Sequence, residues 1–439
     1  MTSILTAERR EQLHRLLDET LDTLPAKLEQ LDEAEQRLQA GMQRLATASM
    51  QGWAETASTA SPPPKCPGCG EPMRHRGLVR RTLVTIHGMI AFVRPRRRCD
   101  RCERESYPLD ARLCFESHGV SWRVAAKVSR LASLLPSYDL ARQLLADDYG
   151  IELSKHSIEQ IVLRGGEMLL HADDAVREAC FADTGRGGPR GPKEAAIHPE
   201  IVAVYADGTM IHAEGDWREI RVGRAIAWNA EGQQLRQRTF ARFLPLESFG
   251  RQLFVEAHAA GYGGAKQRVF LGDGAHWLWE LAALHFPEAT RVLDWYHLSE
   301  KVHETANAVF GEGTEGGKTW AKSRLDELWE GQHRSARQAV AELRQHSRSK
   351  PKRESLRQLS VYLKNNTERM DYPRYRAAGL PIGSGPVESA CKTLVGGRCK
   401  QAGMRNWRRS GAEAVLRFRA AQIDKEFGPL WDARLCRAA

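Results

Sequence analysis

The sequence predicts a multidomain α+β protein. A chain of 439 residues is longer than one compact core usually supports, so we expect about two to four domains. The pattern changes along the chain: leucines at helical spacing come first, then two CxxC pairs, then further helical segments, and after residue 200 apolar runs that alternate with helices. These changes predict N-terminal helices, a cysteine module, a second helical domain and an α/β core, in that order.

The bulk composition indicates a globular chain without a membrane segment. Hydrophobic residues make up 42% of the chain and charged residues 27%, which is ordinary for a globular fold. No apolar run approaches the roughly 20 residues that span a bilayer, and the first residues, MTSILTAERR, become charged too early for a signal peptide. Nine cysteines are an odd number, which argues against a disulfide framework. We therefore expect a cytoplasmic protein.

Positive charge is concentrated in two segments. The net charge is +10 and the isoelectric point is near 9.2. Residues 65–105 and residues 391–439 each hold eleven Lys and Arg against four acidic residues, so the remainder of the chain is slightly acidic. Localised positive charge suggests a polyanionic partner. The alternative is an ordinary solvated surface.

The first helices and the cysteine module are separated by a linker. Leucines recur at helical spacing on both sides of Pro25, which predicts helices within residues 1–53. The stretch 54–64 is rich in Ser, Thr and Pro, as linkers are. A module over residues 65–114 follows, with four cysteines in two CxxC pairs: Cys66, Cys69, Cys99 and Cys102.

The two CxxC pairs predict a structural zinc site. Tetrahedral Zn²⁺ needs four ligands, and each CxxC turn presents two thiolates to one ion. The segment between the pairs alternates apolar residues around His87-Gly88, as a β-hairpin would. Two such turns joined by a hairpin describe a zinc ribbon; a redox-active CxxC pair is the alternative. Arg96, Arg97 and Arg98 lie in this module and are candidates for contacts with DNA phosphates, although many zinc ribbons bind other proteins.

Residues 118–182 predict a second helical domain. Helical periodicity is interrupted at Tyr149-Gly150, and Ser154 is a suitable N-cap for the following helix. This arrangement is compatible with a DNA-binding helix-turn-helix, but any two short helices look alike at this level. A Gly- and Pro-rich stretch at 183–196 follows as a flexible joint.

An α/β core begins after this joint. Three strands are predicted first, and helices then alternate with two more strands; the five strand segments are 201–207, 217–228, 238–244, 267–273 and 290–294. This order is typical of a ribonuclease-H-like core, which would occupy residues 198–298 in its first part. Residues 299–378 are helical and charged and would form an insertion. Residues 379–439 would complete the core and form basic C-terminal helices.

Three of the predicted strands end in aspartate, at Asp207, Asp273 and Asp294. Ligands collect at the carboxyl ends of strands in open α/β sheets, so we expect Asp207 and Asp273 to converge there. Each also has a structural alternative. Asp207-Gly208 suits a hairpin turn, and the other two aspartates precede helices, where aspartate is a favoured N-cap.

A third acid comes from the segment GLPIGSGPVESACK. Pro386 suits the first position of a helix, with Glu388 two residues later; a capping glutamate is the alternative. Three such acids can hold the two Mg²⁺ ions, roughly 3.5–4 Å apart, that activate the attacking oxygen and stabilise the leaving one in displacement at phosphorus. Mg²⁺ prefers oxygen ligands, which Asp and Glu supply.

Several motifs resemble the bacterial insertion-sequence transposases of the Kra type, DDE-class enzymes allied to the Mutator-like group. They are YADGT at Asp207, FLGDGAHW at Asp273, LDWYH at 293–297, and GSGPVESACK followed by RCKQAGMRNW. The resemblance covers the chain from the cysteine module to about residue 420. It implies a ribonuclease-H-like catalytic core with a helical insertion, and Asp207, Asp273 and Glu388 as the acidic triad with catalytic Mg²⁺ or Mn²⁺.

The resemblance also bears on Asp294 and His297. Mutator-like enzymes carry a Cys or Asp, two residues and a His after the second catalytic aspartate, which implies that both residues lie near the active site. Asp294 remains the alternative to Asp273 as the second acid. In the basic C-terminal segment, Trp407 either stacks on a base or packs in the core; five cations there are expected along DNA phosphates: Arg398, Lys400, Arg405, Arg408 and Arg409.

The expected function is DNA transposition. The protein would bind element ends, cleave the DNA and join 3′-hydroxyls to target DNA. Its partners would be double-stranded DNA and further copies of this chain on that DNA, in the bacterial cytoplasm and at the nucleoid. Two alternatives remain: a ribonuclease-H-like nuclease or resolvase without strand transfer, and a non-enzymatic zinc-ribbon DNA-binding protein.

Overall fold

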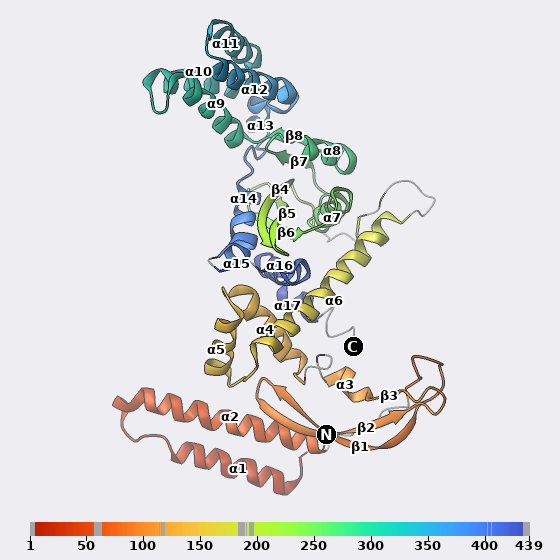
Figure 1. The fold of residues 1–439 in the computed structure, drawn as a ribbon. Coiled ribbons are helices and arrows are strands. Elements are labelled where there is room, and N and C mark those ends of the chain that lie inside the picture. Colours follow the sequence, from red (N-terminus) through yellow and green to blue (C-terminus); the bar gives the residue numbers. More distant parts are fainter. Residues whose placement is uncertain are drawn as a thin grey trace. The chain divides into compact units, whose positions relative to one another are not determined.

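The protein is mixed α+β, with two β-sheets (Figure 1). The computed structural model describes residues 5–56, 64–113, 115, 119–182, 189, 191–192, 197–401, 403–404 and 406–432. Arg405, Cys114 and most residues of the two predicted linkers (57–63, 183–188, 190 and 193–196) lie outside the described residues. Within the described part, no helix is long and apolar enough to cross a membrane.

The chain divides into two compact units. The first contains Met1–Met168 with Gly428–Ala439, and the second contains Leu169–Phe427. The first division falls inside helix α6 (Lys155–Phe181), upstream of the Gly- and Pro-rich stretch at 183–196. The second lies within the short helix α17 (Phe427–Leu430).

The first unit begins with a pair of helices on either side of Pro25. They are α1 (Ala7–Asp22), the 3-10 turn η1 (Leu28–Gln30) and α2 (Leu31–Thr56). The Thr6 hydroxyl accepts the Arg9 N–H at 3.2 Å and caps α1. Gly41 lets the helices approach closely, because an added Cβ there would lie 2.0 Å from Thr20 Cγ2.

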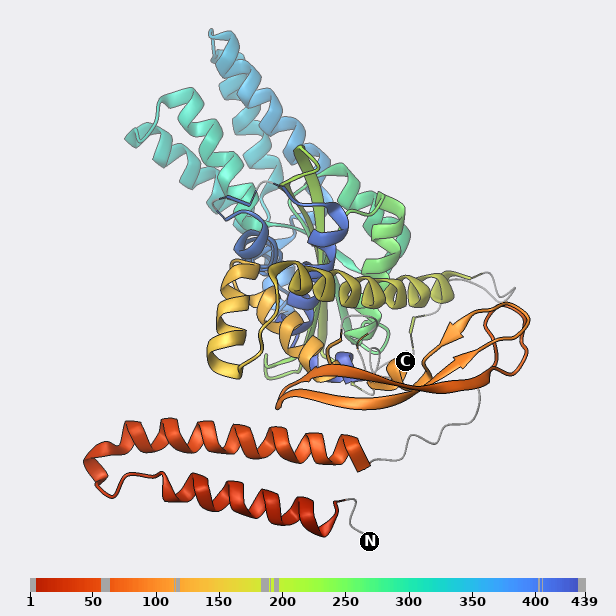
Figure 2. The same cartoon turned by 60° about the horizontal axis from the view of Figure 1, so that its bottom comes forward.

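A three-stranded antiparallel sheet follows, in the order β1-β2-β3. Its strands are β1 (Arg74–Thr85), β2 (Gly88–Arg98) and β3 (Glu105–Ser106). The hairpin expected at His87-Gly88 is present, since Thr85 pairs with Gly88, whose φ of 109° favours glycine (Figure 2). Leu83, Ile90 and Phe92 are buried and pack with partly buried side chains of α2 and α3.

The remaining helices of this unit have well-defined ends. They are α3 (Pro108–Leu113), α4 (Trp122–Leu134), α5 (Tyr138–Tyr149) and the first half of α6. Gly150, with φ 60°, ends α5 in a left-handed C-cap. The expected N-cap of the next helix is present, because Ser154 Oγ accepts the Ser157 N–H at 3.0 Å.

The second unit is built on a five-stranded sheet in the order β6-β5-β4-β7-β8. The strands are β4 (Ile201–Ala213), β5 (Asp216–Trp228), β6 (Gln234–Arg242), β7 (Gln267–Gly272) and β8 (Thr290–Leu293). β4, β5 and β6 are antiparallel to one another, whereas β7 and β8 run parallel to β4. The alternative of a hairpin turn at Asp207-Gly208 is wrong: β4 continues to Ala213, and the turn falls at Glu214-Gly215.

Helices surround this sheet and extend from it. Two helices come between β6 and β8 along the chain: α7 (Leu246–Ala259) and α8 (His276–His285). After β8 the chain is helical: α9 (Trp295–Phe310), α10 (Glu315–Trp329), α11 (His333–His346), α12 (Lys350–Asn366), η2 (Thr367–Arg369) and α13 (Tyr372–Ala377). The last segments are α14 (Gly385–Ala390), the π-helix η3 (Cys391–Gly396), α15 (Gly397–Cys399) and α16 (Arg409–Ile423).

Candidate active site and metal centre

Three aspartates lie at the same register on neighbouring parallel strands: Asp207 within β4, Asp273 directly after β7 and Asp294 directly after β8. The last parallel pairs are Tyr205 with Leu271, between β4 and β7, and Gly272 with Leu293, between β7 and β8. Asp207 and Asp273 each stand two residues beyond the first of these pairs, and Asp294 stands one residue beyond Leu293. Because parallel strands end at the same edge of a sheet, the three carboxylates are brought to one place.

Asp207 is partly buried inside β4, where it pairs with Val222 of β5. Its Oδ1 accepts the Gly208 N–H at 2.7 Å, and its Oδ2 lies 3.4 Å from the Cys391 thiol, which donates to it. Burial raises the pKa of Asp207, and the nearby charge of Asp273 raises it further. A bound cation at this position would offset both effects.

Asp273 lies in the turn between β7 and α8 and is partly exposed. Its Oδ1 accepts the Ala275 N–H at 2.9 Å, and its backbone carbonyl accepts the Tyr362 hydroxyl of α12 at 2.7 Å. Gly274 has φ 101°, and a Cβ there would lie 2.7 Å from the Tyr362 ring. The helical region after β8 therefore directly supports the turn that carries Asp273.

Asp294 is fully buried and serves as the N-cap of α9. Its Oδ1 accepts the N–H groups of Tyr296 at 2.5 Å and His297 at 3.0 Å, and its Oδ2 accepts the N–H of Ser384 at 2.5 Å. Burial alone would raise the pKa of Asp294, but the hydrogen bonds from His297 and Ser384 outweigh it and the pKa is lowered. This carboxylate holds the loop before Glu388 against the start of α9.

His297 lies between acids. Its Nδ1 is 3.6 Å from Asp294 Oδ2 and 3.9 Å from Glu388 Oε1. Asp294, and then the charges of Asp273 and Glu388, raise the pKa of His297 to about 9, so the imidazole is cationic at neutral pH. Its Nδ1 is buried and has no partner at hydrogen-bond distance among the described residues. A cationic ring here compensates part of the negative charge of the cluster.

Glu388 comes from α14, far along the chain from the aspartates. Its Oε1 accepts the Ser384 hydroxyl at 3.1 Å, and 37% of its side chain is exposed. Arg224 of β5 donates to the Pro386 carbonyl at 2.8 Å and fixes α14 to the sheet. One ligand atom each from Asp294, His297 and Glu388 lies within 4.8 Å of the others, as metal ligands do. The structure thus brings all five sequence-predicted acid-site residues into one neighbourhood.

A residue that the sequence analysis overlooked completes this neighbourhood. Cys391 begins the π-helix η3 and is 9% exposed. Burial, followed by the charge of Asp207, raises the pKa of its thiol, so the group stays protonated and donates to Asp207. Its position three residues after Glu388, on the same side of a helix, was the available signal. The switch to π-helical bonding, frequent at functional sites, has no such signal in the sequence.

Neither a scan against protein-family models nor a search of the curated proteins finds a match for this chain.

The basic residues near the C-terminus are placed differently from one another. The expectation for Arg398 needs correction: the residue is 1% exposed, its guanidinium lies 4.8 Å from the Trp407 ring centre, and its Nη1 is 3.7 Å from Met404 Sδ. Its long side chain fills the space under a tryptophan that itself packs partly buried against the core. This arrangement favours the packed role for Trp407 and removes Arg398 from the surface.

The other described cations of this segment are exposed. Lys400 Nζ donates to Thr209 Oγ1 of β4 at 2.5 Å, two residues from Asp207. Arg409 forms an ion pair with Glu214 at 3.1 Å. Arg408 precedes α16 and is exposed. Lys400 is therefore the cation of this group that lies beside the acidic residues.

The four module cysteines form the second cluster of metal-binding groups. Their sulfur atoms all lie within 4.8 Å of one another, and Cys66 and Cys99 are nearly fully buried. The two turns share one geometry. The backbone carbonyls of Cys66 and Cys99 each accept the N–H of the residue four positions later, Gly70 and Glu103. Both of those residues have positive φ. Backbone N–H groups, first that of Gly68, lower the pKa of Cys66 to about 7. The cluster could bind one zinc ion.

The arginines of this module already have acidic neighbours. Arg96 forms an ion pair with Glu105, and Arg98 forms one with Glu103 at 3.0 Å. Arg97 pairs with His75 across the hairpin backbone. Phosphates would have to compete with these carboxylates for Arg96 and Arg98.

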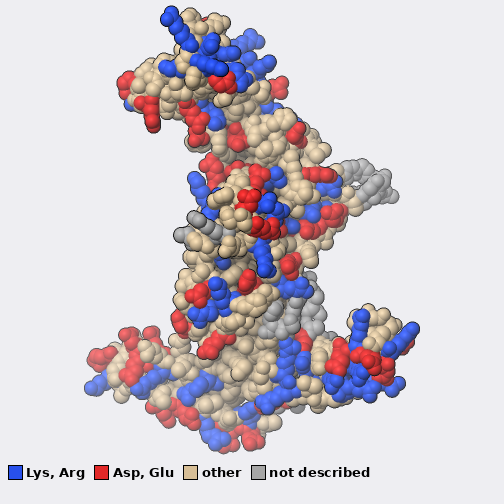
Figure 3. Space-filling view, viewed as in Figure 1, with Lys and Arg blue, Asp and Glu red and all other residues tan. Residues whose placement is uncertain are grey.

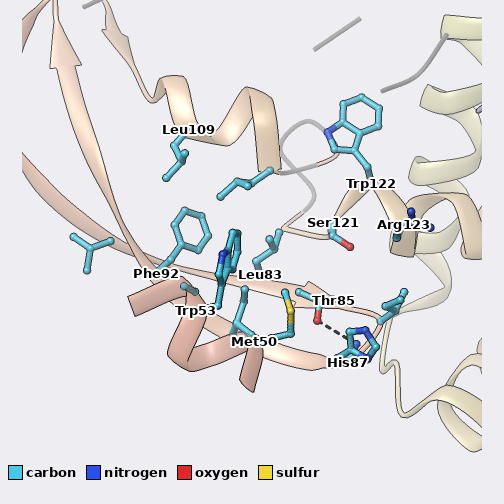
Figure 4. A pocket seen from close by; sticks show the side chains of 15 residues that line it. Met50, Trp53, Leu83, Thr85, His87, Phe92, Leu109, Ser121, Trp122 and Arg123 are labelled. Atoms are coloured by element: carbon cyan, nitrogen blue, oxygen red, sulfur yellow. Dashed lines mark hydrogen bonds between the residues drawn. The ribbon is translucent and has the colours of Figure 1, made fainter. Parts of the chain in front are cut away.

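A cavity of about 730 Å³ lies in the same unit, between α2, the β1–β2 hairpin and α3 (Figure 4). Apolar side chains dominate its described lining, among them Met50, Trp53, Leu83, Phe92, Leu109 and Trp122. None of the described lining residues is acidic or a cysteine. The cavity therefore offers apolar contact but not the chemistry of the acidic residues.

Proposed function

We propose that this chain is a DNA transposase in which Asp207, Asp273 and Glu388 hold divalent cations. The observation that carries the proposal is the register of the sheet: Asp207 within β4 and Asp273 directly after β7 are each two residues beyond the pair Tyr205–Leu271. α14, fixed to β5 through Arg224, adds Glu388 to this edge. Carboxylates are the ligands that Mg²⁺ and Mn²⁺ prefer.

The fold supports the proposal. Three antiparallel strands followed by two parallel ones, in the order β6-β5-β4-β7-β8, is the order expected of a ribonuclease-H-like core. The helices α9–α13 stand between the last strand and Glu388, where the helical insertion is expected. In this interpretation the residues 198–298 and 379–439 form the core and 299–378 the insertion.

The hydrogen bonds favour Asp273 over Asp294 as the second acid. Three backbone N–H groups occupy the Asp294 carboxylate, whereas the Asp273 carboxylate accepts one hydrogen bond from the described residues, that of the Ala275 N–H. Asp273 therefore keeps lone pairs for a cation. When bound, Mg²⁺ or Mn²⁺ would activate the attacking oxygen and stabilise the leaving one.

The chain's own groups have definable tasks around the cations. Cys391 orients the Asp207 carboxylate through its thiol, and Ser384 orients Glu388 through its hydroxyl. Lys400 places positive charge beside the acids, where a phosphate would enter, and His297 lies between Asp294 and Glu388. Double-stranded DNA is the substrate in this proposal, and further copies of the chain would act with it on the DNA.

The decisive test is cleavage of DNA that carries the inverted repeats flanking this element. We expect cleavage and joining of 3′-hydroxyls with Mg²⁺ and neither with EDTA. Asp207→Asn, Asp273→Asn and Glu388→Gln should each lower the rate at least about 10³-fold, because cation stabilisation is worth several kcal/mol. Glu280→Gln is the matched control. Glu280 is an exposed acid of α8 that is not part of the site formed by Asp207, Asp273 and Glu388.

The products separate this function from its alternatives. Cleaved DNA without joined products would indicate a nuclease or resolvase. DNA binding without any cleavage by the parent would indicate a DNA-binding protein without catalysis. Undiminished cleavage by all three acid variants would mean that these acids are not the catalytic residues. Loss of activity in Asp294→Asn together with full activity in Asp273→Asn would exchange the roles of these two residues.

A further inference from the structure

The helical region between β8 and α14 is divided by charge. Residues 299–332, which contain α9 from its fifth residue and α10, hold four Lys and Arg against seven acidic residues. Residues 333–357, which contain α11 and the first half of α12, hold eight against two. Figure 3 shows the blue side chains gathered over α11 and α12. The first half has a net charge of −3 and the second a net charge of +6, so a balance over the whole region hides part of the positive charge of the second half.

The two halves also differ in how their cations are paired. In the first half the cations bind acids three or four residues away, within 3 Å: Lys301 with Glu304, Lys318 with Glu315, Lys322 with Asp326, and Arg324 with Glu327. In the second half, Arg357 with Glu354 is the one ion pair that the described residues form. Its other cations form no ion pair with the described residues, and one of them, Lys352, donates instead to the Val309 carbonyl.

These cations share one surface, which we call the basic face. α11 buries Ala336 and Val340, and α12 buries Leu356 and Leu359. The cations stand on other sides of the two helices and repeat at intervals of three, four or seven residues. The basic face consists of Arg334, Arg337, Arg344, Arg348, Lys350 and Arg353.

The basic face is connected to the acidic residues by a single rigid element. α12 begins at Lys350, and its Tyr362 donates a hydrogen bond to the Asp273 carbonyl. Twelve residues of α-helix span about 18 Å. This distance corresponds to roughly five base-pair steps of about 3.4 Å along a DNA strand.

We propose that the basic face binds the phosphate backbone of duplex DNA about five base pairs from the bond that is cut. The proposal rests on the proposed function, since it places the cut bond at Asp273. Unpaired guanidinium groups recognise phosphate oxygens well. No large hydrophobic side chain of the described residues 333–357 is exposed, which does not suit insertion into a membrane or the apolar core of a protein interface.

The test compares two triple variants that remove the same charge from the same helical region. Arg334→Gln/Arg344→Gln/Arg348→Gln removes cations of the basic face. Lys301→Gln/Lys318→Gln/Lys322→Gln removes cations that are already paired. The probe is a fluorescein-labelled 40-base-pair duplex of random sequence, and its anisotropy is followed from 50 to 200 mM salt in EDTA. Thermal melting verifies that both variants are folded.

Each neutralised phosphate contributes about 0.9 to the slope of log affinity against log salt concentration. The basic-face variant should therefore flatten that slope by about two to three and weaken binding at least about 10-fold at 100 mM salt. The paired-lysine variant should change the slope by less than about one. Equal slopes for the two variants would overturn the proposal.

A footprint on the cleavage substrate tests the position. The basic-face variant should lose protection from hydroxyl radicals about five base pairs from the cut and keep it at the cut itself. Loss of binding to anionic phosphatidylserine vesicles with an unchanged DNA slope would overturn the proposal in favour of a membrane. Binding is measured in EDTA and so does not depend on cleavage. If the basic-face variant flattens the slope but the parent protein does not cleave DNA, the proposed function alone is refuted. Cleavage with an unchanged slope would refute this proposal alone.

Discussion

The cysteine cluster and the acidic residues at the end of the sheet are both suited to cations, but they are built in opposite ways. All four cysteines come from residues 66–102, on two turns of the same geometry. The acids come from β4, the turn after β7, the start of α9 and α14, between residues 207 and 388. The first cluster is therefore fixed by local spacing, and the second by the register of a sheet and the docking of distant helices.

The two sites also differ in what their members do. The four cysteines supply the same chemical group from two matching turns, and such a closed set of ligands is typical of a structural zinc site. The acids are unequal: Asp294 is buried and occupied by N–H groups, whereas Glu388 remains 37% exposed. An open, unequal set is what a site needs when a substrate must also approach the cation.

The strongest way to sharpen this comparison is to remove two of the thiols. We expect Cys66→Ser/Cys99→Ser to lose zinc and the order of both turns, because structural zinc contributes roughly 10–16 kcal/mol of apparent folding free energy. Zinc content of the purified protein and proteolysis of the segment around residues 64–106 measure the two effects. The second unit should keep its thermal transition.

Cys180→Ser is the matched control, since this thiol is buried in α6 and lies outside the cluster. It should keep the parent's zinc content. A double variant with one bound zinc per chain and an intact hairpin would show that the cysteines do not form a zinc site.

The variant Asp294→Asn tests whether one acid of the cluster at the end of the sheet has only a structural role. Asp294→Asn should lower the free energy of unfolding by about 2 kcal/mol at pH 7, because it weakens hydrogen bonds to a charged acceptor. The pKa of Asp294 is lowered in the folded protein, so its ionised form adds stability above the ordinary pKa of 3.8, and that stability is lost as the pH falls through the folded value. The difference in stability between Asp294→Asn and the parent should therefore shrink as the pH falls from 3.8 through the lower, folded pKa of Asp294.

Urea unfolding of both proteins at pH 7 and at several pH values from 3.5 downward measures the effect. Asp273→Asn is the control: it keeps a side-chain oxygen for the Ala275 N–H and removes a like charge near Asp207, so its stability should equal or exceed the parent's. An Asp294→Asn protein as stable as the parent would mean that the carboxylate does not hold the loop before Glu388.

The same contrast explains what the sequence could predict. The hairpin at His87-Gly88, the paired cysteines and the strands that end just before Asp273 and Asp294 all follow from short-range patterns, and the structure contains them. The continuation of β4 beyond Asp207-Gly208 depends on its pairing with β5, which a turn-like dipeptide does not reveal. Tertiary pairing overrode local turn preference there.

Side-chain environments were the least predictable feature. Arg398 looked like a surface cation, but the packing of Trp407 and Met404 around it buries the guanidinium. The contact of Cys391 with Asp207 requires residues 184 positions apart to meet. The basic face was visible in the sequence as a local excess of Arg and Lys, yet the acidic residues of α9 and α10 hid it in the average.

The smallest effect is expected from the arginines of the cysteine module. Arg96 and Arg98 are held by Glu105 and Glu103, so a phosphate gains little by displacing those acids. Replacing Arg96, Arg97 and Arg98 with Gln should therefore flatten the salt slope of DNA binding by less than about one, against two to three for the basic face. Glu103→Gln/Glu105→Gln should steepen it, because the arginines are then released. Anisotropy with the same 40-base-pair duplex compares all of these variants. A slope flattened by nearly three would mean that the acids give way to phosphate, and that the cysteine module contacts DNA as strongly as α11 and α12.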